Sequence, residues 1–412
     1  MITENPSSPG DLKKFVVMLN GNDVTASVIS FDIFQDIFSP TWSAKFFFED
    51  TMNLLATLPI KAGMEITAKI ETNFGGFVGD AEKEFSFIIY RIGDKEMKSQ
   101  AHQSYTIFAA DKAFIENQKK RVSRAFTNQS PQNIVSILVQ EELGGGSVDA
   151  HSSDDNLSII IPNWTPFNAV GWVQRVALCD GAADYCFFQT DKNKFAFKSF
   201  ERMYSSKSEK VERPIFMLRP ANKYEDGNYP EDFTGHIQQF QWQHFDGMAG
   251  VASGMYKSKT VSFDFISKNW NTKTFSYGED TSADNEGKNF EDIMSGEDSN
   301  VTFMPKHSGM YDQGASHLDT IEKWVGSRKS AVQKMDTEKL IIQIGGAVKA
   351  WEWLGKNIQV ELPAQEDMTG EKLDKSRKGN YVVIAICHNV RKDAYMVNME
   401  CIRKRLNKED KK

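Results

Sequence analysis

The chain has 412 residues, of which 40% are hydrophobic, and its formal net charge is −7. This length is typical of roughly two to four domains with a substantial apolar core. The sequence holds no run of the ~20 apolar residues that a membrane helix needs, and its start, MITENPSSPGDLKK, lacks the apolar block of a signal peptide. We therefore expect a soluble protein that is made in the cytoplasm.

The negative charge is concentrated in one segment. Residues 279–298 contain eight acidic residues and a single basic one, Lys288, so the rest of the chain is close to neutral. The acidic residues are Glu279, Asp280, Asp284, Glu286, Glu291, Asp292, Glu297 and Asp298. Without a broad basic surface, binding of nucleic acid along the whole chain is not expected.

Residues 12–113 alternate between apolar and polar side chains, as half-buried strands do. The strand-like runs are 15–21, 24–37, 43–50, 63–73, 84–97 and 104–111, with a short helix at 51–58. The turn Asn20-Gly21-Asn22-Asp23 tolerates positive φ and predicts a hairpin between the first two runs. Five or six antiparallel strands within about a hundred residues predict a first β-barrel over 12–113.

Residues 114–210 change to a mixed pattern of helices and a hairpin. In PQNIVSILVQEEL (131–143) apolar residues recur at helical spacing, with Ser130 as the predicted N-cap and Pro131 as the first helical residue. The run GGGS (144–147) ends this helix. DYCFFQTDKNKFAFKSF (184–200) then predicts a hairpin that turns at Asp191-Lys192-Asn193-Lys194.

IIPNWTPFNAVGWVQRVAL (160–178) contains the clearest helix start in the chain. Thr165 is the predicted N-cap and Pro166 the first helical residue. Gly171 interrupts the helix, which predicts the close approach of a neighbouring backbone, with a merely tolerated glycine as the alternative. The apolar stripe, which we expect to cover the hairpin 184–200, consists of Ala169, Trp172, Val173 and Val176.

Strand-like text returns in the last third of the chain. The runs are 236–245, 255–266, 338–346, 350–363, 380–390 and 394–406. They predict a second β-barrel built from 211–266 plus 338–406, and its similar pattern favours duplication of one barrel type. From Tyr381 to Cys387 the apolar residues are almost continuous, which predicts a strand covered on both faces.

The predicted insertion spans 267–337. Residues 267–315 are rich in Ser, Asn, Asp, Gly and Glu, so we expect a long loop or a poorly ordered segment. SHLDTIEKWVGSRKSAVQKMD (316–336) predicts a helix. Its apolar face holds Ile321, Trp324, Val325 and Val332.

No motif for catalysis or metal binding is present. The seven histidines show no HExxH or HxH spacing, and the sequence lacks GxSxG, GxxxxGK[ST] and GxGxxG. We therefore expect no catalytic, cofactor-binding or metal-binding residues. The cysteines stand singly without CxxC spacing, which favours buried free thiols over disulfides or zinc. They are Cys179, Cys186, Cys387 and Cys401.

Some weaker candidates have two interpretations. His388 could act as a base, but at the end of an apolar strand a packed histidine is favoured. Glu141 and Glu142 could form the carboxylate pair of a glycosidase, but adjacent helical residues point apart, which favours a solvated helix end. The acidic segment 279–298 could bind calcium, but it lacks the regular DxDxDG spacing. Core or interface anchors are favoured over a carbohydrate platform for three tryptophans, Trp242, Trp351 and Trp353.

Two stretches carry a resemblance to a known family. They are NWTPFNAVGWVQRVALCDGAADYCFFQTDKNKFAFKSF (163–200), and GKNIQVELP (355–363) followed by NYVVIAICHNVRKDAYMVNMECIRKRL (380–406). With the order of the segments, they resemble the central baseplate hub protein of contractile-tailed bacteriophages and, more distantly, the head part of type VI secretion spike proteins. The resemblance implies a mainly β fold with α+β insertions: two antiparallel tail-tube-like β-barrels and a mixed helix and hairpin module.

The resemblance also implies a structural role. A homotrimer with two barrels per chain would form a pseudo-sixfold ring between the tail tube, or a tube-initiator protein, and the central spike, and DNA would pass without specific binding. Baseplate wedge or sheath-proximal proteins would be further partners, and the protein would assemble in the host cytoplasm into the virion tail baseplate. Because the chain stops at Lys412, the needle and any lytic activity, as in a spike-lysozyme, are expected on a separate partner.

Two alternatives remain open at this point. One is a cell-wall (peptidoglycan) hydrolase of a phage tail that uses scattered carboxylates. The other is a carbohydrate-binding tail module, which is supported only by the aromatic content of 12% of residues.

Overall fold

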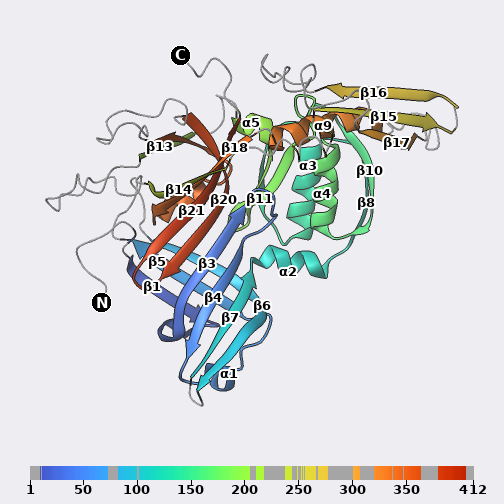
Figure 1. Ribbon diagram of the computed structural model, residues 1–412. Helices are drawn as coiled ribbons and strands as arrows, with labels where there is room; N and C mark the ends of the chain where they lie inside the picture. The colour runs from blue at the N-terminus through green and yellow to red at the C-terminus, as the bar shows by residue number, and fades with distance from the viewer. Residues whose placement is uncertain are drawn as a thin grey trace.

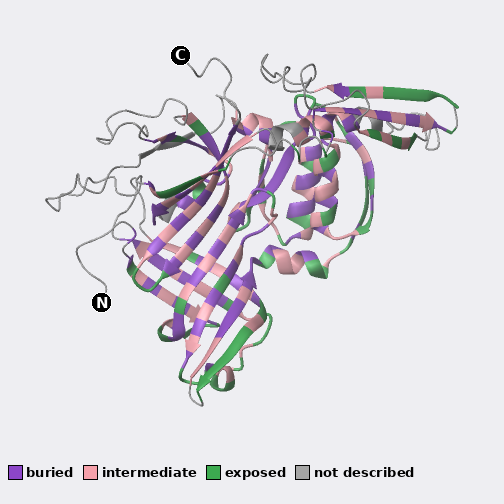
Figure 2. Cartoon of the chain, viewed as in Figure 1, coloured by how far each residue is buried: buried purple, intermediate pink, exposed green. Residues whose placement is uncertain are grey.

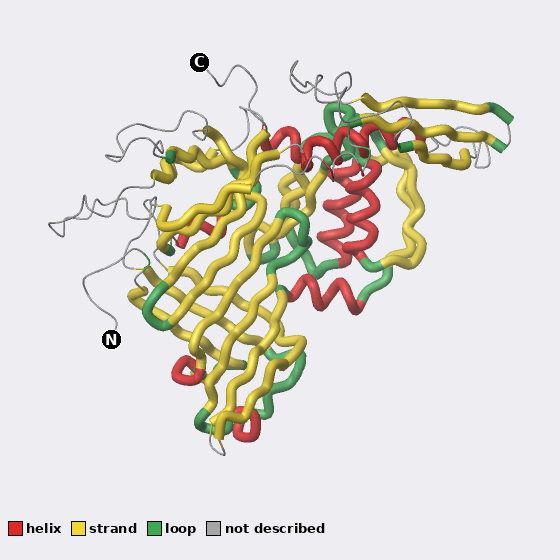
Figure 3. Tube along the Cα trace, in the orientation of Figure 1, coloured by secondary structure: helices red, strands yellow, loops and turns green. Residues whose placement is uncertain are grey.

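The computed structural model shows a mainly β protein whose longer helices gather in one region, while short helical turns lie at the far end of the sheet (Figure 3). The structure describes residues 10, 12–72, 82–99, 102–204, 210–217, 237–243, 248, 252, 254, 256–265, 268–276, 300–306, 320–335, 337–346, 348–362 and 379–404. The expected fold class, mainly β with α+β insertions, is confirmed at this level.

One large sheet of 13 strands dominates the molecule (Figure 1). Its first strand block consists of β1 (Leu12–Leu19), β2 (Asn22–Asp23), β3 (Val28–Asp36), β4 (Ser43–Asp50), β5 (Glu65–Thr72), β6 (Glu82–Ser99) and β7 (His102–Ala110). Its second strand block consists of β13 (Lys210–Met217), β14 (Ile237–Gln243), β18 (Thr337–Gly345), β19 (Asn357–Glu361), β20 (Gly379–Arg391) and β21 (Tyr395–Lys404). The main pairing path runs β14-β18-β21-β20-β3-β4-β7-β6-β5-β1-β2, and β19 branches from β20 to pair with β13.

The two strand blocks join where β3 pairs with β20 in antiparallel register, from Ala385 opposite Asp36 to Arg391 opposite Ser30. Both blocks therefore share one hydrogen-bonded sheet and one apolar core. Among the described strands the path does not return on itself, so the sheet is not closed into two barrels. It does curl, because Phe15 of β1 stacks on Phe31 of β3 with ring centroids 5.6 Å apart although these strands are far apart along the path.

The predicted turn at residues 20–23 exists, but the hairpin is short. Asn20 and Gly21 adopt positive φ, and Leu19 lies opposite Asn22, as the motif predicts. β1 then pairs along its length with β5, whereas β3 pairs with β4 and β20, so the hairpin ends at Asp23 and does not continue into the second run as expected. The reason is local: Oγ1 of Thr25, in a 3-10 turn (Thr25–Ser27), accepts a hydrogen bond from Val17 N in place of a strand partner.

The chain from Lys112 to Tyr204 forms a mixed module that we call the helical module. Its elements are α2 (Lys112–Lys119), β8 (Val122–Gln129), α3 (Pro131–Ile137), a π-helical continuation η2 (Leu138–Glu142), β9 (Ser147–Ala150), β10 (Leu157–Trp164), α4 (Pro166–Val176), β11 (Tyr185–Asp191), β12 (Lys194–Ser199) and α5 (Phe200–Tyr204). Helices α3 and α4 lie between the β8–β10 pair and the β9, β11 and β12 sheet (Figure 1). The module thus has its own apolar core.

Helix α4 begins as the sequence predicts. The Thr165 side chain accepts a hydrogen bond from Asn168 N at 3.4 Å, and Pro166 is the first helical residue. The most buried residues on its inner face are Ala169, Val170 and Val173, while Trp172 and Val176 are only partly buried. The predicted close approach at Gly171 is wrong, because the nearest atom to an added Cβ would be Oε1 of Gln174 at 3.8 Å.

The predicted insertion contains strands where we expected a loop. β15 (Lys257–Asp264) pairs with β16 (Trp270–Ser276) and β17 (Val301–Lys306) in a separate sheet, which we call the projecting sheet, and α9 (Thr320–Met335) contacts all three strands. β15 therefore does not pair with the second strand block as expected. The reason is that 270–276 and 301–306 contain several aromatic and β-branched residues, which favour strands but are outnumbered by the surrounding polar residues. The acidic segment 279–298 lies outside the described residues.

The remaining elements of the first and last thirds follow the sequence with shifted ends. The short helix is α1 (Leu54–Thr57), and the strand expected over 350–363 splits into a 3-10 turn (Val348–Glu352) and β19. In β20 the residues Tyr381, Val382 and Val383 are fully buried in succession, and burial alternates beyond them. The expected double covering thus holds for the first half of this strand. On α9, Trp324 is buried as expected, whereas the side chains of Ile321 and Val332 lie outside those described.

Candidate functional site

The hairpin β11–β12 is a wall shared by the two apolar cores. Tyr185, Phe187, Phe195 and Phe197 point into the core of the helical module, where they stack in pairs at 4.3 Å and 5.3 Å between ring centroids. The alternate residues Cys186, Phe188 and Ala196 point into the core of the large sheet. Side chains of a strand alternate between faces, so one hairpin can bind both cores together. The turn at Asp191 and Lys194 is as predicted.

Gln189 fastens this hairpin to the first strand block. Its Oε1 accepts from Trp42 N at 3.0 Å, its Nε2 donates to Asp111 Oδ2 at 2.9 Å, and its carbonyl oxygen accepts from the Trp42 indole Nε1 at 2.9 Å. Gln189 is 1% exposed, so these bonds are made without competition from water. The position of the helical module relative to the sheet is therefore specified by directional hydrogen bonds as well as by apolar contact.

Lys83 lies where the helical module and the two strand blocks meet. Its ammonium forms an ion pair with Asp191 of the hairpin at 3.0 Å. It also lies 4.3 Å from the ring centroid of Trp351, in the 3-10 turn between β18 and β19 of the second strand block. Lys83 itself belongs to β6 of the first strand block. An ion pair combined with a cation–π contact favours one fixed arrangement of the three parts.

His388 is buried at the seam between β20 and β3. Its Nε2 is 3.0 Å from Gln35 Oε1, which can only accept, so Nε2 carries the proton and Nδ1 accepts from the Tyr395 hydroxyl at 2.7 Å. Gln35 Nε2 in turn donates to the Trp351 carbonyl at 3.4 Å. Burial, together with the nearby Lys83 charge, lowers the pKa of His388 to about 3. The packed-histidine interpretation is confirmed, with both ring nitrogens bonded.

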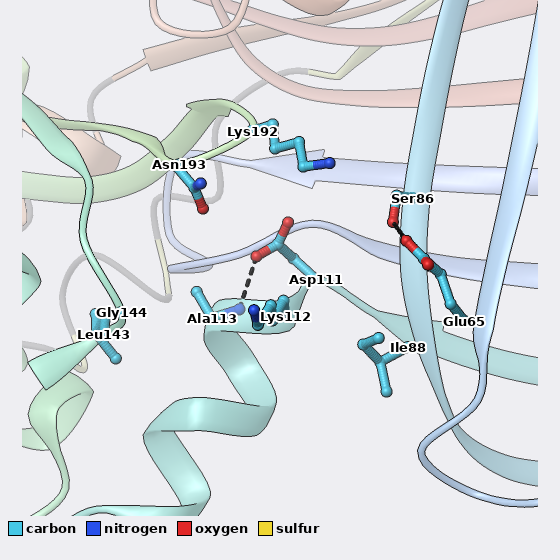
Figure 4. Close-up of a pocket in the computed structure, with 10 residues that line it drawn as sticks. All are labelled: Glu65, Ser86, Ile88, Asp111, Lys112, Ala113, Leu143, Gly144, Lys192 and Asn193. Atoms are coloured by element: carbon cyan, nitrogen blue, oxygen red, sulfur yellow. Dashed lines mark hydrogen bonds between the residues drawn. The ribbon is translucent and has the colours of Figure 1, made fainter.

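A cavity of about 220 Å³ opens where the helical module meets β5 and β6 (Figure 4). Its polar lining includes Glu65, which accepts from the Ser86 hydroxyl, and Asp111, which accepts from Ala113 N at 2.8 Å as the N-cap of α2. Lys112 and Lys192 add positive charge at its edge. Both carboxylates thus hold local donors, and Asp111 also accepts from Gln189 of the helical module. The ten lining residues include no histidine or cysteine.

The weaker sequence candidates lie apart from one another. Glu141 is ion-paired with Arg124, and Glu142 is 3.9 Å from Lys120, on the exposed end of η2 as the solvated interpretation predicts. Trp351 and Trp353 are buried in the core of the large sheet, and Trp242 packs at its edge against Tyr381, so the anchor interpretation is confirmed.

Other features bear on chemistry within the described part of the chain. No three metal-ligating side chains converge there. The described helices include none that is long and apolar enough to cross a membrane. The four cysteines are free thiols; three are buried and Cys387 is partly exposed.

Sequence reasoning missed the residues that hold the parts together. Gln35 and Gln189 occupy positions on apolar strand faces, and a glutamine in such a position is a usable signal of a buried hydrogen bond. Lys83 carries no such signal, because its partners Asp191 and Trp351 are brought near only by the fold.

Comparison of sequences finds no relative: no known protein family matches this chain, and no curated protein matches it. Comparison of structures does. The 43 kDa tail protein of prophage MuSo2 from Shewanella oneidensis has a TM-score of 0.54 at 10% identity, covering 94% of this chain and 97% of that one. The tail protein from Neisseria meningitidis MC58 also has a TM-score of 0.54 at 10% identity, covering 94% and 96%.

A type VI secretion system component of E. coli aligns with a lower TM-score of 0.47 at 8% identity, over 95% of this chain and 77% of that chain. The fold assignment rests on the two tail proteins. The resemblance to phage tail proteins expected from the sequence is confirmed at the level of the fold, over nearly the whole length of both chains. This protein has the fold of phage tail proteins.

Proposed function

We propose that this protein is the structural hub of a phage-type tail baseplate. It acts as a homotrimeric ring that joins the tail tube, or a tube-initiator protein, to the central spike and lets DNA pass. Wedge or sheath-proximal proteins bind its outer side. Its place is the virion tail after assembly in the host cytoplasm, and it catalyses no reaction.

One observation carries this proposal: each chain holds two strand blocks, of seven and six strands, joined edge to edge through β3 and β20 in a tail-protein fold. Three such chains offer six strand blocks, which matches a sixfold tube on one side and a threefold spike on the other. In the assembled ring each block would act as one tail-tube-like barrel. Residues 12–113 would form the first, and 211–243 plus 338–406 the second, since β15 belongs to the projecting sheet.

The buried junction supports a load-transmitting role. Lys83, Gln189 and His388 fix the helical module and both strand blocks to one another by ion pairs and buried hydrogen bonds. Such contacts favour one arrangement over its alternatives. An adaptor between two symmetries needs this rigidity, because any shift between its parts would misalign the tube and the spike.

The proposal is tested by co-expressing the chain with the spike and tube proteins from the same genome and measuring mass by light scattering. Three copies of the 46.6 kDa chain in each complex, after the mass of the bound partners is subtracted, and rings with threefold symmetry in electron micrographs are expected. A chain that stays monomeric with both partners present would overturn the hub.

The hydrolase alternative is tested separately on peptidoglycan gels. We expect no lytic zone, because Glu141 is ion-paired with Arg124 and Glu142 lies 3.9 Å from Lys120. A lytic zone that disappears in Glu141→Gln or Glu142→Gln would establish the enzyme instead.

A further inference from the structure

The cavity of about 220 Å³ lies at the seam between the helical module and the first strand block. β5 and β6 form one wall, and three segments of the helical module form the other: the start of α2, the turn after η2 and the turn of the β11–β12 hairpin (Figure 4). The cavity is smaller than the roughly 300–1,000 Å³ of most small-molecule and cofactor sites. The space therefore suits a short piece of peptide better than a cofactor.

Both carboxylates of the cavity already have donors. Asp111 is 7% exposed; its Oδ1 accepts from Ala113 N at 2.8 Å and its Oδ2 from Gln189 Nε2 at 2.9 Å. Glu65 Oε1 accepts from the Ser86 hydroxyl. The negative charge of Asp111 is thus engaged within the wall, whereas the exposed Glu65 can still accept a donor at its second oxygen.

The two lysines of the cavity have no such partner. Neither Lys112 nor Lys192 forms an ion pair or a side-chain hydrogen bond within the described part of the chain. By contrast, Lys119 later in α2 and Lys194 at the end of the same hairpin turn are ion-paired, at 3.0 Å and 3.5 Å. The Lys192 side chain extends from the turn over the cavity toward β6 (Figure 4). The polar capacity that the lining leaves unused is therefore mainly that of two ammonium groups.

Apolar and amide groups complete the lining. Ala113 and Leu143 are each 4% exposed, and Ile88 is half-buried, so these three residues give the cavity an apolar part. The side-chain amide of Asn193 faces the cavity from the hairpin turn (Figure 4). An occupant that satisfies the site thus needs a negative group for the lysines, a donor for Glu65 and a small apolar part.

An acidic residue of a peptide chain meets these three needs. Its carboxylate pairs with the ammonium groups of Lys112 and Lys192 in charge-assisted hydrogen bonds. A backbone N–H of the peptide donates to Glu65, and the CH₂ groups of the acidic side chain contact Ile88 and Leu143. Sulfate would supply neither the donor nor the apolar part. The chemistry of the lining therefore favours a peptide carboxylate over an inorganic anion.

We propose that this cavity binds an acidic residue of another polypeptide in the tail assembly. The inference rests on the proposed hub and names the chemistry of one contact within it. Because the occupant touches the helical module as well as β5 and β6, it fastens the seam from outside, as Gln189 does from within. Binding of the partner and rigidity of the seam are therefore coupled.

Carbodiimide crosslinking identifies the occupant, because this reagent forms an amide directly between a lysine amine and a carboxylate in contact with it. The chain is crosslinked in its complex with the co-expressed spike and tube proteins. Peptides that join Lys112 or Lys192 to a carboxylate of another polypeptide are expected. Mixing isotopically labelled and unlabelled chain distinguishes a second copy from the same chain. Crosslinks of these lysines only within the chain, for example to 279–298, or none at all, overturn the inference.

A double variant, Lys112→Gln with Lys192→Gln, measures the contribution of the two charges, and Lys95→Gln is the matched control. Lys95 also has no ion pair among the described residues and lies in the distal half of β6, most of which is exposed (Figure 2). All three positions are exposed, so circular dichroism and melting temperature should match those of the wild type.

The double variant is expected to raise the dissociation constant for the crosslinked polypeptide at least tenfold, and Lys95→Gln to leave it within twofold. A complex that binds this polypeptide equally well in the double variant overturns the inference and leaves the hub intact. A wild-type chain that assembles with neither itself nor the spike and tube proteins removes the hub, and the inference with it.

Discussion

Two aromatic hairpins of this protein have opposite surroundings. In β11–β12 both faces are covered, one by the helices of the module and the other by the large sheet, and alternate residues fill two cores. In β15–β16 only one face is covered: Ser258, Thr260, Ser262 and Phe275 are each at most 2% exposed, whereas Trp270 on the other face is 66% exposed. Both hairpins alternate as strands should, so alternation identifies the faces of a strand but does not tell which face has a partner.

The covered hairpin is expected to show the largest effect. Phe197→Ala removes a fully buried ring that stacks on Tyr185, and it should lower the free energy of unfolding by about 3–5 kcal/mol. Urea denaturation followed by circular dichroism measures this loss. A loss below about 1 kcal/mol would show that the shared wall is not a core element.

The core behind this hairpin is expected to respond to acid through His388. Its pKa is about 3 in the folded chain and about 6.5 when unfolded, so between these values the unfolded chain binds the additional proton. Stability from this residue is thus complete above pH 6.5 and falls as the pH drops toward 3, on the order of 3–5 kcal/mol in all.

The measurement is the free energy of unfolding from pH 7 to pH 3.5 in the wild type and in His388→Gln. The variant is expected to be less stable at pH 7 and to depend less on pH, because its side chain does not titrate. Parallel pH profiles for the two proteins would contradict the assigned role of His388.

Gln189→Ala tests the attachment of the covered hairpin. It leaves Trp42 N and Asp111 Oδ2 without their partner in a buried site, which should cost about 2–3 kcal/mol. Gln174→Ala is the control, since Gln174 makes one long bond of 3.4 Å to the Tyr185 carbonyl oxygen and should cost under ~1 kcal/mol. Equal losses in the two variants would remove the special place of Gln189.

Trp172→Ala tests how α4 covers the hairpin. Trp172 is only partly buried and packs edge-on against Trp164 with ring centroids 5.5 Å apart, so we expect a loss of about 1–2 kcal/mol. The 3–5 kcal/mol that is typical of a fully buried tryptophan does not apply here. Thermal unfolding measures it, and a loss above ~3 kcal/mol would show that the ring is part of the core.

The smallest effect is expected for a residue of the projecting sheet. Phe303→Ala, studied at a concentration where the chain is monomeric, should change the free energy of unfolding by less than ~0.5 kcal/mol, since the ring is 72% exposed. A loss comparable to that of Phe197→Ala would mean that the ring is covered within its own chain.

Features fixed by neighbouring residues were predictable from the sequence. The start of α4 depends on one capping hydrogen bond between Thr165 and Asn168, three residues apart, and on Pro166. The turn depends on the positive φ angles of Asn20 and Gly21. Partners of strands were not predictable in the same way. β3 pairs with β20 rather than with β1, because shared cores and distant edges decide the pairing.

The junction and the projecting sheet show two other limits. Composition averaged over 267–315 concealed two strands of seven and six residues, each of which contains aromatic and β-branched residues. The ion pair between Lys83 and Asp191 joins residues 108 positions apart, and nothing local in the sequence connects them. Gln35 and Gln189 were the available signals, as polar residues on apolar strand faces.

The seam between β3 and β20 has a consequence for synthesis of the chain. Gln35 and His388, which meet there, are 353 residues apart in sequence. At about 5–20 residues per second, the ribosome needs about 20–70 s to make the second strand after the first. During that time one edge of β3 has no partner and is open to mispairing. We therefore expect chaperones to bind the nascent chain before β20 has been made.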